Sequence, residues 1–351
     1  MGEGVAIASH TEGRRGRTMR VAEAWISAAV TVAGPTEVRG PLGAAFDVPL
    51  RDDLLGERSW ERAEWRMGQR AVGLLAQRLG VAITDFDLML AGDLTNQITA
   101  STFAARELDI PFLGTFTACA TFVEALGLAA LLCDGGYAHL ICVAVTSHHH
   151  VVERQYRFPT ELGNQRPPCA QWTATGAAAF AVRAGAGEHP LARIEGFTPG
   201  RVIDYRITDP FDMGSAMAPA AADTLTAHLE DMGRQPGEYG ALYTGDLGRV
   251  GVPICEELLR DRGIDVRLHD CGIELYDPGH QDVHAGGSGT ACSALVFGSS
   301  VLPRLTQDWS AVCLVGTGAL HSPTTYQQRE SIPAVAHAIS VCRPDLPKGG
   351  A

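Results

Sequence analysis

The sequence lacks an apolar run long enough to cross a membrane, and it is poor in positive charge. No stretch reaches the roughly 18–20 apolar residues that a membrane-spanning helix needs. The 351 residues include 28 Lys and Arg against 40 Asp and Glu, a formal net charge of −12. Binding to nucleic acid and adhesion to an anionic membrane surface both depend on clustered basic residues. We therefore expect neither a nucleic-acid-binding protein nor one that adheres directly to anionic lipids.

The nine cysteines form no C-x-x-C pair, and they are scattered through apolar segments. This distribution argues against a disulfide framework or a zinc site and fits a reducing compartment. His148, His149 and His150 form a separate candidate metal tract. Three adjacent side chains on a regular element do not all face one ion, so we favour a polar loop there. We expect no metal and no cofactor.

Residues 1–19 contain Arg14, Arg15 and Arg17 but no apolar core of the signal-peptide type. We expect a disordered extension over these residues, with Met19 as an alternative initiator. The folded part is then expected to begin near residue 20.

The composition does allow a large core, because 46% of the residues are hydrophobic and 19% are charged. A first strand is expected within residues 20–35. A helix is expected from Ser59, a good N-cap residue, to Leu79, where Gly80 follows as a stop. The apolar residues 88–91 predict a second strand.

One stretch, residues 111–147, organises the rest of the chain. Cys119 stands among small residues directly before an apolar helical pattern, which Gly135 and Gly136 end. Residues 140–145 then indicate a parallel strand buried on both faces. Unpaired N–H groups at a helix start favour a thiolate or a bound carboxylate. The alternative interpretation is a small cysteine packed in the core.

The same order of elements returns in the second half. A helix from about Pro219 to Met232 precedes a strand over residues 241–244, and an apolar helix that opens at 286–289 and runs to Val301 precedes a strand over 311–315. Four pairs of identical residues are each 153 positions apart: Gly80 and Gly233, Gly92 and Gly245, Asp93 and Asp246, and Leu94 and Leu247. We infer a tandem duplication with halves at residues 20–212 and 213–345.

Strands that alternate with helices predict an α/β fold with mixed, mostly parallel sheets and helices on their faces. Two such halves bury their apolar sides by packing face to face. The helix starts at Cys119 and at Gly287 and Ser288 then approach one another across a pseudo-twofold axis. A pocket at that convergence is the default ligand site.

A proline-rich loop between the halves carries Arg154, Arg157 and Arg166, with Asn164 and Gln165. Basic and amide groups on a loop can clamp carboxylates. The alternative interpretation is a set of solvated loop charges.

These motifs resemble two groups of proteins. Thr117-Ala118-Cys119-Ala120 resembles the nucleophile segment of the thiolase and ketoacyl synthase superfamily. A more extensive resemblance, in order from about Arg20 to residue 340, is to the stage V sporulation protein AD family. It rests on residues 40–47, 90–94, 154–161, 212–224, 244–247, 285–289 and 327–333. The resemblance implies a thiolase-like fold whose duplicated halves form five layers, α-β-α-β-α.

The resemblance also implies a role in endospore formation. Members of that family bind dipicolinic acid in a pocket placed like the thiolase active site. They work with membrane-embedded partners of the same sporulation system to load it into the forespore, as peripheral proteins of the spore inner membrane on its cytoplasmic face. A homodimer is implied by the thiolase-like fold, and calcium is left open as a companion of the ligand.

Two departures bear on chemistry. The ketoacyl synthases place a catalytic histidine just after the second-half strand, where this chain has Thr244-Gly245-Asp246, and an asparagine at the start of the second-half helix, where it has Gly286-Gly287-Ser288. A condensing reaction needs a thiolate and donors that hold an oxyanion. Cys119 is present without these helpers, and His148 or His284 are the candidate substitutes.

Two hypotheses follow. In the first, a former condensing-enzyme pocket holds a dianion, with Cys119 as a vestigial nucleophile. Its contacts would come from Ser147, His148, Arg154, Arg157, Asp246, Gly287 and Ser288. In the second, the chain is an acyl-CoA-dependent acyltransferase that uses Cys119. A docking platform for membrane partners is a third interpretation, compatible with the first.

Overall fold

The computed structural model describes residues 16–345. Its strands form two sheet halves with the same order. The first half runs β2-β8-β6-β4-β5 and the second β9-β14-β13-β10-β11. The strands of the first half are β2 (Ala24–Ala33), β4 (Leu88–Gly92), β5 (Phe112–Gly114), β6 (Leu140–Ser147) and β8 (Gly176–Ala184). Those of the second are β9 (Ala192–Thr198), β10 (Ala241–Thr244), β11 (His269–Asp270), β13 (Ala311–Ala319) and β14 (Ala334–Cys342).

The direction of the strands repeats as well. β8 is antiparallel to both neighbours in the first half, and β14 is antiparallel to both neighbours in the second. The remaining neighbours, β6, β4 and β5 in one half and β13, β10 and β11 in the other, are parallel. The α/β fold with duplicated halves and mixed, mostly parallel sheets is therefore confirmed.

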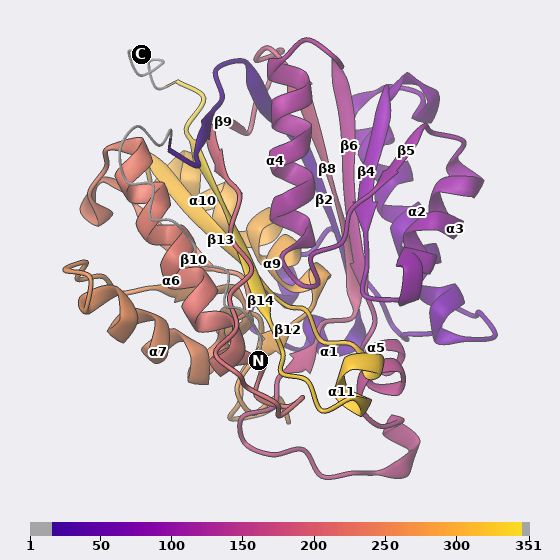
Figure 1. The fold of residues 1–351 in the computed structure, drawn as a ribbon. Coiled ribbons are helices and arrows are strands. Elements are labelled where there is room, and N and C mark those ends of the chain that lie inside the picture. The colour runs from indigo at the N-terminus through magenta and orange to yellow at the C-terminus, as the bar shows by residue number, and fades with distance from the viewer. Residues whose placement is uncertain (1–15, 346–351) are drawn as a thin grey trace, which may run out of the picture.

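Helices cover both sheets and separate them (Figure 1). Helices α2 (Trp60–Leu79) and α3 (Thr99–Leu108) lie outside the first sheet half, and α6 (Met213–Met232) and α7 (Gly248–Arg260) lie outside the second. Helices α4 (Thr121–Asp134) and α9 (Thr290–Val296) lie between the halves. These are the five layers expected for the fold. The halves also share an edge, because β2 pairs with β9 at Trp25 and Ile26.

The shorter elements complete the chain. They are β1 (Met19–Arg20), α1 (Pro35–Val38), β3 (Val48–Pro49), α5 (His149–Tyr156), β7 (Trp172–Thr173), α8 (Cys271–Leu275), β12 (Gly287–Ser288), α10 (Leu302–Gln307) and α11 (Pro323–Gln327). Single 3₁₀ turns occupy Gly43–Ala45, Ile83–Asp85, Asn96–Ile98, Thr160–Leu162 and Pro236–Glu238.

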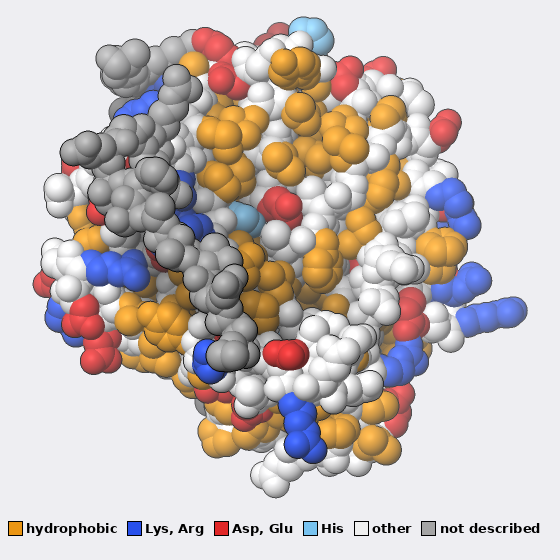
Figure 2. Space-filling model, in the orientation of Figure 1, with side chains coloured by type: hydrophobic (Ala, Val, Ile, Leu, Met, Phe, Trp, Pro, Cys, Tyr) orange, Lys and Arg blue, Asp and Glu red, His pale blue; other side chains and the backbone are white. Residues whose placement is uncertain are grey.

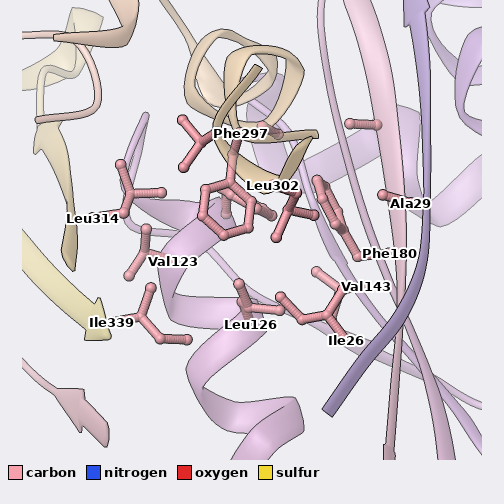
Figure 3. Packing of buried hydrophobic residues seen from close by; sticks show 14 of the residues in the cluster. Ile26, Ala29, Val123, Leu126, Val143, Phe180, Phe297, Leu302, Leu314 and Ile339 are labelled. Atoms are coloured by element: carbon pink, nitrogen blue, oxygen red, sulfur yellow. The ribbon is translucent and has the colours of Figure 1, made fainter. Parts of the chain in front are cut away.

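The central helices carry the main core (Figure 3). Phe122 of α4, Phe180 of β8 and Phe297 after α9 are fully buried, with ring centroids 4.8–6.0 Å apart. Ile339 of β14 and Leu126 of α4 belong to the same cluster. Burial of each such side chain stabilises the fold by roughly 1.5–3 kcal/mol. Side chains from both halves thus pack against the same central layer of helices. This packing sets the position of the start of α4 relative to the start of α9.

Several helix boundaries differ from expectation. The helix α6 begins at Met213, six residues before Pro219, because Asp212 caps it by accepting a 3.2 Å hydrogen bond from the Ser215 amide. The helix expected from 286–289 to Val301 is α9 followed by a π-helical turn, Phe297–Val301, and then α10. The helix from Ser59 is confirmed, since the Ser59 hydroxyl accepts from the Arg62 amide.

The histidine tract is not a polar loop. His149 and His150 begin α5, and His148 and His149 are buried at 0% and 2% exposure. The tract turns inward because β6 delivers it into the space between α2 and the β7 strand. Its local sequence is polar, so only the packing of these elements reveals the burial.

The boundaries of the two halves remain a prediction, and two observations bear on them. Residues 1–15 of the expected extension lie outside the described residues, but Arg17 pairs with Asp223 at 2.9 Å and Met19 pairs with Phe197 of β9. The strand β9 has the sheet position in the second half that β2 has in the first. We propose a boundary between Ala184 and Ala192 in place of the one expected at residue 212.

The surface on the side of the molecule seen in Figure 1 carries apolar side chains interspersed with charged ones (Figure 2). Acidic and basic groups are mixed over this face, and the basic ones form no continuous stripe. This agrees with the net charge of −12.

Candidate functional site: a pocket between the two central helices

Cys119 lies in a tight turn directly before α4. Ala118 has a positive φ of 51°, and the amides of Ala120 and Thr121 donate to the carbonyls of Thr117 and Ala118. The turn packs against Gly318 of β13, where an added Cβ would lie 2.1 Å from the Thr117 carbonyl oxygen. The absence of a side chain at Gly318 therefore lets the second half touch the cysteine turn of the first.

Ser288 approaches the same place from the second half. Its strand β12 pairs in parallel with β7, and Gly289, with φ 105°, turns the chain into α9. The Sγ atom of Cys119 and the Oγ atom of Ser288 are 3.8 Å apart. The predicted convergence of the two helix starts is confirmed by this distance.

Asp246 lies behind this pair and is 1% exposed. Its carboxylate accepts hydrogen bonds from the Thr317 hydroxyl at 2.6 Å and from the Gly289 amide at 3.1 Å. Burial raises the pKa of Asp246 to about 7, and the nearby charge of Asp270 adds to the rise. Near neutral pH a share of the Asp246 side chains is therefore protonated.

The Cys119 thiol is kept neutral. Burial raises its pKa well above the usual value, and the negative charge of Asp246 raises it further. Hydrogen bonds from Ser288 and the Gly289 amide act in the opposite direction but are smaller. The direction of this shift is opposite to the lowered thiol pKa that favours acyl transfer, because desolvation outweighs the field of the helix start.

A pocket of about 480 Å³, open solvent at its mouth included, lies over Cys119 and Ser288. We call it the Cys119 pocket. Its lining consists of Leu94, Phe116, Ala118, Cys119, Val152, Tyr156, Arg157, Thr173, Met213, Met217, Ser288, Ala319 and His321. Most of these side chains are apolar, so the few polar ones determine what the pocket can hold.

Two polar residues of the lining are engaged with other protein groups. Arg157 forms an ion pair with Glu153 at 2.6 Å and donates to the Pro210 carbonyl. A ring nitrogen of His321 lies 3.2 Å from the Tyr156 carbonyl oxygen. Burial lowers the pKa of His321, so its ring is neutral near pH 7. Arg157 therefore supplies the cationic group of the lining.

Thr173 differs from these residues. Its hydroxyl oxygen is buried and has no hydrogen-bond partner among residues 16–345. Leaving a buried hydroxyl unpaired costs roughly 1–3 kcal/mol. Because Thr173 lines the Cys119 pocket, a polar ligand there could satisfy it.

The other residues predicted for the site lie elsewhere. Ser147 is fully buried, donates to the Ala174 carbonyl and accepts from the Ala291 amide, so it anchors the start of α9. A ring nitrogen of His148 lies 2.9 Å from the Asp53 carbonyl oxygen. Arg154 pairs with Glu61. The Gly287 carbonyl accepts from the Gln171 side chain. None of these four lines the Cys119 pocket.

The candidate substitute bases are also displaced. His284 pairs with Asp282 at 3.1 Å, outside the pocket lining. Sequence reasoning missed His321, Thr173 and Tyr156, which do line it. His321 lies two residues after the end of β13, as His149 lies two residues after the end of β6, so the repeat was a signal that could have pointed to it. In residues 16–345 no group of three His, Cys, Asp or Glu side chains is arranged to hold a metal ion.

The fold of the chain is shared with solved structures of known fold class. Crystal structures of Xanthomonas campestris OleA have the same fold: a form soaked with cerulenin gives a TM-score of 0.61 at 14% identity, covering 92% of this chain and 100% of that one. A form co-crystallised with cerulenin gives 0.57 at 15% identity, covering 94% and 99%. The chain therefore has a thiolase-like fold.

The family follows from sequence. The family model for stage V sporulation protein AD matches residues 15–342. The Bacillus subtilis stage V sporulation protein AD is 44% identical over 318 residues, 90% of this chain and 93% of that protein. The chain belongs to the stage V sporulation protein AD family and is a sporulation protein. Over residues 16–345, no helix combines the length and apolar character of a membrane span.

Proposed function

We propose that this protein binds dipicolinate, pyridine-2,6-dicarboxylate, in the Cys119 pocket and so helps its uptake into the forespore. The observation that carries the proposal is a thiolase-type pocket whose cysteine is held as a neutral thiol beside Asp246. Such a pocket has the shape of an active site without an activated nucleophile. Binding of a ligand needs only the shape and the polar groups of the pocket, and these are present without an activated nucleophile.

The lining suits a flat anion with an apolar ring. Phe116, Met213 and Met217 offer apolar contact for the ring. Arg157, Ser288 and Thr173 offer donors for the carboxylates. The partial protonation of Asp246 reduces the repulsion that a second anion would meet there. Among the residues expected from sequence, we propose Cys119, Arg157 and Ser288 as ligand contacts, with Asp246 behind them.

Calorimetric titration with dipicolinate tests the proposal. Ser288→Phe fills the pocket and should abolish the binding heat. Thr173→Val keeps the shape but removes the unpaired hydroxyl, and we expect roughly three- to tenfold weaker binding from the loss of one hydrogen bond. The matched control is Arg154→Gln, on α5 but outside the lining, which should bind like the wild type. No heat with the wild-type protein, or undiminished binding by Ser288→Phe, would reject the proposal.

The acyltransferase hypothesis retains one favourable observation, because Cys119 is half-buried and lines the pocket. The raised pKa of its thiol weighs against it, and so does the lack of a histidine in the Thr244-Gly245-Asp246 segment, where the ketoacyl synthases have their catalytic one. Incubation with acyl-CoA followed by intact-mass measurement separates the two: binding alone predicts no adduct, and an acylated Cys119 would favour the enzyme.

We extend the proposal to partners. Membrane proteins of the same sporulation system would hold the chain at the cytoplasmic face of the forespore or spore inner membrane, with calcium as an optional companion of the ligand. A homodimer is supported by the edge strand β5 and the residues just after it: Leu113 of β5 is 52% exposed, and Phe116, two residues beyond the strand, is 45% exposed. Sedimentation equilibrium tests the dimer, and co-purification from sporulating cells tests the membrane partners.

A further inference from the structure

A second hollow also borders α5, but His149 and Glu153 of the helix line it, whereas Val152 and Tyr156 line the Cys119 pocket. It is lined by His149, Phe158, Asn164, Arg166, Trp172 and Phe211, among others, and measures about 620 Å³ with open solvent included. We call it the Trp172 pocket. The two hollows share an ion pair as a wall, because Arg157 lines the first and its partner Glu153 lines the second.

Three nitrogen atoms of this lining are buried without a partner among the described residues. They are Nη1 of Arg166, Nε1 of Trp172 and Nδ1 of His149. An arginine N–H and an indole N–H can only donate hydrogen bonds. Buried donors left unpaired are rare in folded proteins and are costly. The presence of the two donors, Arg166 Nη1 and Trp172 Nε1, around one hollow indicates a group that accepts hydrogen bonds from them.

The three side chains are positioned by contacts with one another and with Asp282. The rings of His149 and Trp172 stack with centroids 3.5 Å apart and an interplanar angle of 4°. The Arg166 guanidinium lies 4.9 Å from the Trp172 ring centroid, and Arg166 Nη2 is 3.0 Å from Asp282. His149 is only 2% exposed, and burial holds its ring neutral by lowering its pKa. A ligand that binds these side chains therefore loses little free energy to ordering them.

The charged groups around the hollow form two ion pairs, Glu153 with Arg157 and Arg166 with Asp282, so among residues 16–345 no uncompensated negative charge of this lining repels an anion. Glu153 is neutralised by Arg157 within the protein, with both side chains at most 6% exposed. Asp282 is 78% exposed at its side chain, so water screens its repulsion. Phe158, Pro159 and Phe211 give the mouth apolar walls. A bare inorganic anion would leave these walls unused.

We propose that the Trp172 pocket is a second binding site, for a carboxylate carried on a flat apolar body. The carboxylate accepts from Arg166 Nη1 and Trp172 Nε1, and the apolar body lies against Phe158 and Phe211. The site is separate from the Cys119 pocket and does not depend on dipicolinate binding there.

Calorimetric titration of the full chain with benzoate tests this site. The wild type should bind, and Arg166→Gln should bind about tenfold or more weakly, the loss expected for one charge-assisted hydrogen bond. Trp172→Phe keeps the stacking ring and loses only the donor, so we expect roughly three- to tenfold weaker binding. Arg166→Lys keeps the charge and should fall between wild type and Arg166→Gln.

The matched controls are Arg106→Gln and Trp65→Phe, an exposed arginine and a stacked tryptophan outside the hollow, which should bind benzoate like the wild type. Thermal unfolding of each variant checks that it is folded. Two results overturn the proposal: no benzoate binding by the wild type, or binding that survives Arg166→Gln and Trp172→Phe. Loss confined to Ser288→Phe would assign benzoate to the Cys119 pocket and also overturn it.

Discussion

The sulfur of Cys119 lies 3.8 Å from the hydroxyl oxygen of Ser288, although 169 positions separate them in the chain. Each residue shortly precedes one of the two central helices, and each comes from a different half of the duplication. The contact therefore marks the pseudo-twofold meeting point of the fold. Burial at this point disfavours the thiolate of Cys119, and the charge of Asp246, placed behind the pair, adds to the effect.

Thiol reactivity provides the first prediction. We expect Cys119 of the wild type to react slowly with iodoacetamide at pH 8, because its raised pKa leaves little thiolate. Asp246→Asn keeps an acceptor for Thr317 but removes the negative charge, so the pKa of Cys119 should fall and its alkylation should accelerate about tenfold. Peptide mass spectrometry separates Cys119 from the half-buried Cys169. Asp277→Asn, at an exposed aspartate, is the control and should leave the alkylation rate of Cys119 unchanged. An equally unchanged rate in Asp246→Asn would contradict the prediction.

A second prediction concerns pH and stability. Burial raises the pKa of Glu37 from 4.5 to about 7, although Tyr276 and the Thr175 amide donate to its carboxylate. The folded state thus binds a proton more tightly than the unfolded state. The stabilisation that this bound proton contributes is fully present below pH 4.5 and is lost as the pH rises through 7. The free energy of unfolding then falls by on the order of 3 kcal/mol.

Glu37→Gln keeps an acceptor and cannot ionise, so it should remove this part of the pH dependence. Urea unfolding at pH 5 and pH 8 measures it. Relative to the wild type, the variant should be more stable at pH 8 than it is at pH 5. If the difference in unfolding free energy between variant and wild type is the same at both pH values, the assignment to Glu37 is wrong.

The ion pair between Arg157 and Glu153 is a third test. Both side chains are nearly buried, at 6% and 5% exposure. Arg157→Ala leaves Glu153 uncompensated and should cost roughly 3–5 kcal/mol of unfolding free energy, while the double replacement by alanine should recover part of that loss. Denaturant unfolding of all four proteins gives the coupling. The exposed pair of Arg106 and Glu107 is the control and should show almost none.

Two glycines make a fourth, matched pair. An added Cβ at Gly318 would meet the Thr117 carbonyl at 2.1 Å, so Gly318→Ala should push the Cys119 turn aside and lower both stability and dipicolinate affinity. At Gly73 in α2 nothing lies within 4 Å of an added Cβ. Gly73→Ala should therefore stabilise the helix by about 0.5–1 kcal/mol. Thermal unfolding measures the stability of both variants. If Gly318→Ala is as stable as Gly73→Ala, the close contact between Gly318 and the Cys119 turn is wrong.

Local patterns were most informative where a segment carries its own signals. Ser59 and Gly80 bound α2 as expected, and the apolar run after Gly135 and Gly136 is β6. The start of α6 was misplaced, because the cap Asp212 stands well ahead of the apolar face around Pro219. Signals of this kind act within one helical turn, so they were visible without any tertiary information.

Site membership was harder to predict. Arg154 and Arg157 are three positions apart on one short segment, yet one pairs with Glu61 outside the pocket and the other lines it. The burial of His148 and His149 and the unpaired hydroxyl of Thr173 were invisible for the same reason. Each depends on which neighbour faces the side chain.

By itself the sequence determined the duplication, the thiolase-like class, the family and the positions of Cys119 and Ser288 at the starts of two helices, because periodicity, glycine stops and motifs are local properties of the chain. Only the tertiary structure decided that burial, with the charge of Asp246 added, would hold the thiol neutral. It also decided that Arg157 rather than Arg154, together with Thr173 and His321, would line the pocket. Burial and electrostatic fields arise from residues far apart in sequence, and packing alone brings those residues together.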